Sequence, residues 1–114
     1  MSDLANKECV PCIGGAPPLA EDESADLSEH LHEDWSIVKN HHLIRSWEFS
    51  DFASAISFTN KLGGICEEQN HHADFELGWG RVQAIIYTHK IDGLTESDFI
   101  LAAKIDRLDG GSGG

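Results

Sequence analysis

Positively charged residues are scarce in this sequence of 114 residues, in which eight lysines and arginines stand against 20 aspartates and glutamates. The formal net charge of −12 describes a surface that repels phosphate backbones and anionic lipid. The acids gather in residues 21–34, a pattern typical of a solvated helix face. We therefore expect no direct binding to nucleic acid or to a membrane.

Long apolar runs are also missing, and residues 1–20 do not read as a secretory signal. These absences predict a cytoplasmic protein. A length of 114 residues with 40% hydrophobic content suits one domain with a modest core. We expect an extended arm over residues 1–18, a folded domain over 19–108 and a flexible Gly-rich tail over 109–114.

Cysteines are few: a Cys9-x-x-Cys12 pair and a single Cys66. A zinc ribbon needs a second pair, which the chain lacks. A thioredoxin-like site needs a strand before the pair and a helix after it, whereas Pro17-Pro18 follows. The pair is interpreted as part of a reduced amino-terminal arm, with metal or redox work as the alternative.

The apolar spacing predicts the order helix, two strands, helix, two strands, helix. The predicted helices cover residues 19–33, 51–63 and 95–105, and the predicted strands cover 35–38, 43–49, 75–79 and 82–89. Propensity ends the second helix at Gly63-Gly64, because each interior glycine costs close to ~1 kcal/mol relative to alanine. This order is typical of an α+β domain with a four-stranded antiparallel sheet and three helices packed on one face.

Three of the seven histidines flank the predicted hairpin 75–89, where its two strands begin and finish. His71 and His72 precede its first strand, and His89 closes its second. With the turn near Trp79 to Arg81, antiparallel pairing brings those ends together, so His71 or His72 is expected to meet His89 across one pocket mouth. Imidazole titrates near neutral pH, which makes these residues candidates for proton transfer.

Other interpretations of these residues stay open. Adjacent histidines on a strand point to opposite faces and rarely bind one ion together, so no metal site is expected. The three histidines can instead be scattered surface residues. Asp98 stands three residues after Thr95 at a helix start, where a capping acid is common, and that role is compatible with a functional one. His41 and His42 fall in a predicted turn and receive no catalytic role.

Six residues carry a recognisable pattern of an acid, a histidine pair, an aromatic residue, a later histidine and a final aspartate: Glu67, His71, His72, Trp79, His89 and Asp98. This pattern resembles that of the pterin-4a-carbinolamine dehydratase family. The resemblance also includes residues 70–74, 80–82, 88–89, 93–100 and the arm with Cys9, Cys12 and Pro17-Pro18, so it covers nearly the whole chain. By this comparison the second helix continues to about Glu68. Two positions depart from the family: Ala73 replaces a usual proline, and Gly80 a usual asparagine.

The resemblance implies dehydration of a 4a-hydroxytetrahydropterin to the quinonoid dihydropterin, a hydro-lyase step of tetrahydrobiopterin recycling without metal or organic cofactor. It also implies that His71, His72 and His89 are catalytic residues lining the pterin pocket. Glu67, Trp79 and Asp98 would bind or orient the pterin or the imidazoles. We expect His72 to be the principal proton-transfer group; which histidine is acid and which is base is left open.

The resemblance also implies a homodimer or homotetramer, and symmetric assemblies of these sizes are the most frequent among soluble oligomers. A second hypothesis is a non-catalytic assembly factor on the same fold, since proteins resembling this family assist assemblies such as Rubisco. A protein partner would then dock on a sheet edge. Retention of the full set of histidines and acids favours catalysis.

Overall fold

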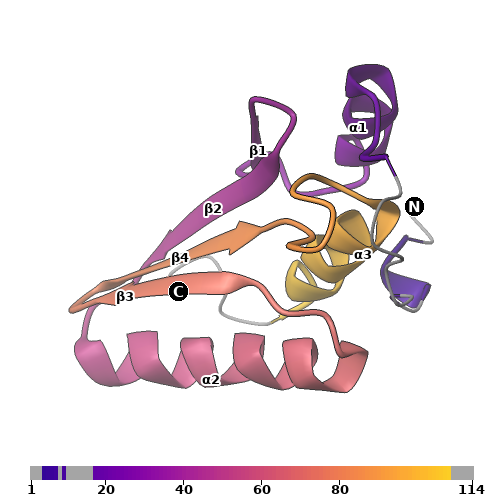
Figure 1. The fold of residues 1–114 in the computed structure, drawn as a ribbon. Helices are drawn as coiled ribbons and strands as arrows, with labels where there is room; N and C mark the ends of the chain where they lie inside the picture. The colour runs from indigo at the N-terminus through magenta and orange to yellow at the C-terminus, as the bar shows by residue number, and fades with distance from the viewer. Residues whose placement is uncertain (1–3, 8, 10–16, 109–114) are drawn as a thin grey trace.

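The computed structural model describes residues 4–7, 9 and 17–108. After a short 3-10 helix, η1 (Leu4–Asn6), the elements follow in the order α1 (Glu21–Ser28), β1 (Ser36–Val38), β2 (His42–Glu48), α2 (Phe52–Gln69), β3 (Asp74–Gly78), β4 (Arg81–Ile86) and α3 (Glu96–Ile105). The strands form one antiparallel sheet in the order β1-β2-β4-β3 (Figure 1). The predicted α+β class with three helices and a four-stranded sheet is confirmed.

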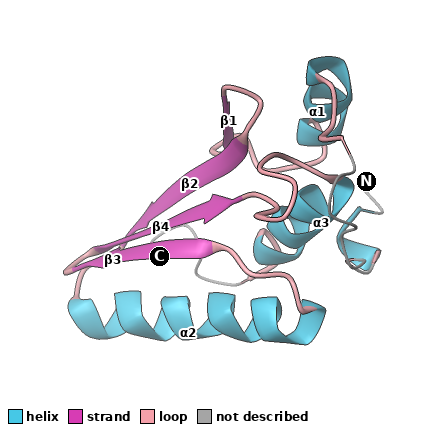
Figure 2. Ribbon diagram, in the orientation of Figure 1, coloured by secondary structure: helices cyan, strands magenta, loops and turns pink. Residues whose placement is uncertain are grey.

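One face of the sheet is apolar because alternate side chains of each strand point the same way. On β2 and β4 the paired residues Leu43 with Ile86 and Trp47 with Val82 are buried. Helix α2 runs along the sheet and α3 lies at the end where β4 finishes (Figure 2). Helix α1 packs against α3. The opposite face carries polar pairs across the strands, such as Ser46 Oγ donating to Gln83 Oε1 (3.0 Å).

Helix α2 passes through Gly63 and Gly64 and ends at Gln69, so the propensity-based stop is wrong and the family-based extension holds. Asp51 caps its start by accepting from the Ser54 amide (2.7 Å). Burial of Leu62 and Cys66 on the side that carries Phe58 outweighs the cost of two glycines. Tertiary packing therefore decides this helix.

Two predicted boundaries shift. Helix α1 is shorter than predicted: it begins at Glu21, where the Glu23 carboxylate accepts from the Ala20 amide (2.9 Å), and it ends at Ser28 in hydrogen-bonded turns. Strand β4 stops at Ile86 rather than at His89, and His89 lies in the loop beyond it. The predicted turn between β1 and β2 is confirmed, with Lys39 and Asn40 in the left-handed region.

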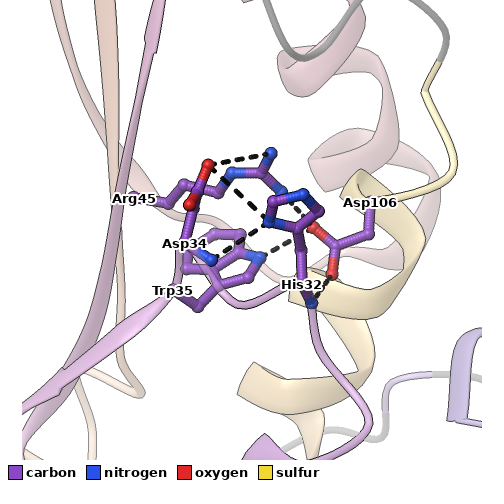
Figure 3. Close-up of polar contacts among 5 residues, drawn as sticks. All are labelled: His32, Asp34, Trp35, Arg45 and Asp106. Carbon is purple, nitrogen blue, oxygen red and sulfur yellow. Dashed lines mark hydrogen bonds and ion pairs between the residues drawn. The ribbon is translucent and has the colours of Figure 1, made fainter.

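A buried polar cluster joins β2, the segment before β1 and the end of α3 (Figure 3). Arg45, whose side chain is 4% exposed, donates to Asp106 Oδ1 (2.7 Å). The Trp35 indole donates to the same oxygen (2.7 Å), and the His32 amide donates to Asp106 Oδ2 (2.9 Å). Asp34 lies 3.9 Å from the guanidinium. These contacts anchor the carboxyl-terminal end of α3 to the sheet.

The amino-terminal residues that the structure describes pack onto α3. Leu4 and Ala5 are buried, and Lys104 donates to the Ala5 carbonyl (2.9 Å). The Cys9 amide donates to Gln69 Oε1 (3.0 Å) near the end of α2. Cys12 and the predicted Gly-rich tail lie outside the described residues. No helix within the described ranges is both long and apolar enough to cross a membrane.

Candidate active site

His71 and Asp98 form the buried part of the candidate site. Helix α2 ends at Gln69, its capping residue Asn70 is in the left-handed conformation (φ 52°), and the chain then turns toward the start of α3. His71 Nε2 donates to Asp98 Oδ1 (2.6 Å). The Asp98 side chain is fully buried, and its Oδ2 accepts from Thr88 Oγ1 and from the Thr95 amide, both at 2.8 Å. The first turn of α3 and these donors stabilise the buried carboxylate.

Asp98 is therefore both the helix-start acid and the partner of an imidazole, which are the two roles considered from the sequence. Three donors and the helix end fix the carboxylate, so the His71 ring is held by a rigid support. With a side chain 11% exposed, His71 reaches the surface only at its edge.

His72 and Glu67 form a second, exposed pair. His72 Nε2 donates to Glu67 Oε2 (2.5 Å), and the two side chains are 53% and 78% exposed. Glu67 lies in the last turn of α2, so the end of this helix supplies the carboxylate that orients His72. The exposed ring of His72 is accessible to a ligand from solvent.

His89 and Asp74 form the third pair. His89 Nε2 lies 3.5 Å from Asp74 Oδ2, and both side chains are more than half exposed. Because Asp74 is the first residue of β3, this contact puts His89 at the end of the hairpin that also carries His71 and His72. The structure thus brings the three predicted histidines, Glu67 and Asp98 to one end of the sheet.

Trp79 lies at the other end of the hairpin. It occupies the turn between Gly78 and Arg81 and is 68% exposed. A strand of five residues separates the two ends by about 17 Å. The structure therefore does not bring Trp79 together with the histidines; Figure 1 shows the turn between β3 and β4 at the opposite end of the hairpin from the start of β3.

Both departures from the family pattern have local partners. A proline in place of Ala73 would remove the amide hydrogen of this residue, whose backbone acts to lower the pKa of the Cys66 thiol. Burial nevertheless raises the pKa of that thiol above its ordinary value. At Gly80 an added Cβ would lie 2.7 Å from the Phe49 carbonyl oxygen, so the close approach of the two chains requires glycine there.

The arrangement suits proton transfer. A carboxylate only accepts hydrogen bonds, so His71 and His72 in their neutral forms carry the proton on Nε2 and keep a lone pair on Nδ1. Protonated rings would be donors at both nitrogens. Within the part of the chain that the structure describes, no three His, Cys, Asp or Glu side chains converge as a metal site.

Sequence reasoning missed Thr88, Thr95 and Asp74 as parts of this site. Thr88 and Thr95 hold Asp98, and Asp74 contacts His89. The position of Thr88 beside His89 and the hairpin register are signals that could have found two of them. Contact between Thr95 and Asp98 follows from the predicted helix start.

Comparison with known protein families gives a match over most of the chain. The family model described as pterin 4 alpha carbinolamine dehydratase matches residues 17–108. A provisionally named pterin-4-alpha-carbinolamine dehydratase of Rubrobacter xylanophilus is 56% identical over 95% of this chain and 100% of its own length. Another from Alkaliphilus metalliredigens is 48% identical over 94% and 96%.

Two solved structures share the fold. A transcriptional coactivator/pterin dehydratase from Brucella melitensis is 29% identical with a TM-score of 0.70, over 77% of this chain and 94% of its own. A pterin dehydratase-like protein identified as a RuBisCO assembly factor in the alpha-carboxysome is 24% identical with a TM-score of 0.57, over 71% and 94%. At that identity the second likeness concerns the fold alone.

Proposed function

The chain belongs to the pterin-4a-carbinolamine dehydratase family, and on that premise we propose that it dehydrates a 4a-hydroxytetrahydropterin to the quinonoid dihydropterin. The observation that carries the proposal is the gathering of three histidine–carboxylate pairs at one end of the sheet. Family membership gives the reaction class, and these pairs supply the groups that such a reaction requires.

The reaction breaks an N–H bond and the C4a–O bond, and it forms a C=N bond and a molecule of water. A base removes a proton from a ring nitrogen of the pterin, and the electrons of that N–H bond form a C=N bond. The C4a–O bond breaks, and an acid protonates the departing hydroxyl, which leaves as water. One imidazole must therefore be neutral in order to accept a proton, while another must be an imidazolium in order to donate one. Each such group typically contributes roughly 10²- to 10⁴-fold to the rate.

Accessibility supports His72 as the principal proton-transfer group. Its ring is about half exposed and is oriented by Glu67, whereas His71 is nearly buried against Asp98. In this proposal His71 and His89 complete the pterin pocket, and Glu67 and Asp98 keep the Nδ1 atoms of their partners toward the substrate. The role predicted for Trp79 has no support from its position in the distant turn.

Self-association belongs to the same proposal. Phe52 and Ile56 lie one turn apart on α2 and remain 43% and 37% exposed, which gives this helix an apolar stripe toward solvent. We expect a homodimer or homotetramer in which such a stripe is covered. Light scattering coupled to gel filtration measures this directly, and Phe52→Glu should shift the mass toward the monomer.

The proposed activity is tested by stopped-flow absorbance of 4a-hydroxytetrahydropterin dehydration, with and without the purified protein, across neutral pH. The protein should accelerate formation of the quinonoid product above the spontaneous rate. No acceleration by a folded protein would overturn the proposal and favour the assembly-factor role that a structural neighbour has.

A further inference from the structure

Four aromatic rings form a row beside the candidate site, and two of them come from the β1–β2 hairpin, His41 from its turn and His42 from the first position of β2. The Tyr87 ring contacts the His89 ring at a centroid distance of 4.2 Å and the His41 ring at 4.7 Å, each tilted by 39°. His42 packs edge-on against His41 at 5.3 Å. His41 and His42 thus have a place next to the site that their sequence position did not indicate.

The sheet register explains why these residues meet. Leu43 of β2 pairs with Ile86 of β4, so His42, the first residue of β2, lies beside Tyr87, the residue that follows β4. His41 Nε2 also lies 2.7 Å from Asp92 Oδ1. Asp92 belongs to the loop that carries His89, and its amide donates to the Thr88 carbonyl (2.8 Å). Two contacts of His41 therefore connect the β1–β2 turn to that loop.

His89 needs such support more than the other two histidines do. Short hydrogen bonds to carboxylates fix His71 and His72, at 2.6 and 2.5 Å. The partner of His89 lies 3.5 Å away and both side chains are exposed, which makes a weak, solvent-screened ion pair. The closest ring contact of His89 is the one with Tyr87.

We propose that His41 and Tyr87 are positioning residues that set the orientation of the His89 ring, so that the β1–β2 turn forms part of the active-site support. The catalytic consequence rests on the proposed dehydratase function, whereas the orientation of His89 does not. His41 acts through Tyr87 and through Asp92, and neither His41 nor Tyr87 needs to touch the substrate.

The direct test is the His89 imidazole signal in heteronuclear NMR spectra, assigned with His89→Ala. His41→Ala leaves both members of the Tyr87–His89 ring pair unmutated, so a shift of the His89 ring signals reports reorientation passed on through Tyr87 or the loop. His30→Ala removes an exposed histidine after α1 and serves as the matched control. We expect the His89 signals to move in His41→Ala and to stay in place in His30→Ala.

Steady-state dehydration gives the second readout. Tyr87→Leu should lower kcat by about threefold to tenfold, the effect of losing one aromatic pair, with a smaller change in KM. Tyr87→Phe keeps the ring and should restore wild-type values. In the Tyr87→Leu background, His41→Ala should add less than it does alone, because the two residues act in one path.

His89 signals that are unchanged in His41→Ala, or equal kcat in Tyr87→Leu and Tyr87→Phe, would overturn the proposal. If the wild-type protein shows no dehydration, the proposed function fails, yet the NMR comparison still decides whether His41 and Tyr87 position His89. His41→Ala changes a partly exposed side chain, so the test holds even if Tyr87→Leu does not fold.

Discussion

Two carboxylates, one at each end of α3, accept similar numbers of hydrogen bonds but have different kinds of partner. Asp98 in the first turn and Asp106 at the carboxyl-terminal end each accept several hydrogen bonds and tie the helix to the sheet. Asp106 is held by a guanidinium, an indole and a backbone amide, none of which acts as an acid or a base near neutral pH. Asp98 is held by two threonines and an imidazole, which does.

Under the proposed function, similar acid anchors serve a structural role at one end of α3 and a catalytic role at the other. Both ends of α3 use an acid that accepts several hydrogen bonds, fully buried at Asp98 and partly buried at Asp106, so hydrogen bonding alone does not distinguish them. The difference is the titratable partner and its neighbours, since His71 is followed by the exposed His72 and lies at the sheet end that carries His89. The Arg45–Asp106 cluster should therefore govern stability, and the histidine cluster should govern turnover.

The largest effect should come from His72→Ala. If His72 is the principal proton-transfer group, as proposed, its removal should lower kcat by about 10²- to 10⁴-fold, and the half-exposed position should leave the fold intact. Stopped-flow kinetics and urea unfolding of the same preparation measure both quantities. Unchanged turnover in this variant would remove the mechanism.

Breaking the other cluster should act on stability instead. Asp106→Ala leaves the guanidinium of Arg45 buried without its main partner, which should lower the free energy of unfolding by about 3–5 kcal/mol. Asp34→Asn is the matched control, because Asp34 is more distant from Arg45 and its side chain is 58% exposed. Urea unfolding should separate the two variants; equal midpoints would argue against a structural role for the cluster.

Asp98→Asn should affect both properties, because Asp98 is an anchor and also orients His71. Replacing a charge-assisted hydrogen bond by a neutral one should cost about 1.5–3 kcal/mol of stability or orientation. We expect turnover to fall less than in His72→Ala and stability to fall less than in Asp106→Ala. Turnover and the free energy of unfolding should be measured on the same preparation. A change in only one of these quantities would contradict the double role of Asp98.

Gly64→Ala should raise stability without touching either cluster. A Cβ at this position meets nothing within 4 Å, and an alanine in a helix interior is favoured over glycine by about 0.8–1 kcal/mol. Thermal unfolding should shift upward while kcat stays at the wild-type value. A fall in Tm would indicate that the position is covered by another copy of the chain.

The smallest effect concerns pH. Burial, and next the charge of His41, hold the pKa of His42 below its ordinary value of 6.5. As the pH falls, His42 therefore becomes protonated in the unfolded chain before it does so in the folded protein. The stability that neutral His42 contributes above about pH 6.5 is lost as the pH falls from that value to the pKa of His42 in the folded protein. His42→Gln should lose less stability between pH 7.5 and 5.5 than the wild type, as measured by urea midpoints. An equal loss would contradict the assignment.

Periodicity was sufficient for most of the fold. Alternating burial of Leu43, Arg45 and Trp47 and the helix-start chemistry of Thr95 to Asp98 follow from local sequence. The end of α2 did not, because local propensity counts the cost of Gly63 and Gly64 but not the burial of Leu62 and Cys66 against the sheet. The family comparison supplied that information indirectly.

The site was predictable only as far as hairpin geometry reaches. Antiparallel pairing places His71, His72 and His89 at one end, and the same geometry places the turn with Trp79 at the other. The contact of Asp74 with His89 and the ring row through Tyr87 and His41 depend on side-chain directions in two loops. No period in the sequence encodes those directions.

Turnover is expected to depend on the histidine cluster at the amino-terminal end of α3, and stability on the Arg45–Asp106 cluster at its carboxyl-terminal end. The most direct measurement is kcat and the urea midpoint of His72→Ala and Asp106→Ala, determined side by side at a temperature where both are folded. The account predicts a lost kcat with an unchanged midpoint for His72→Ala, and the reverse for Asp106→Ala. Parallel loss of both quantities in both variants would contradict it.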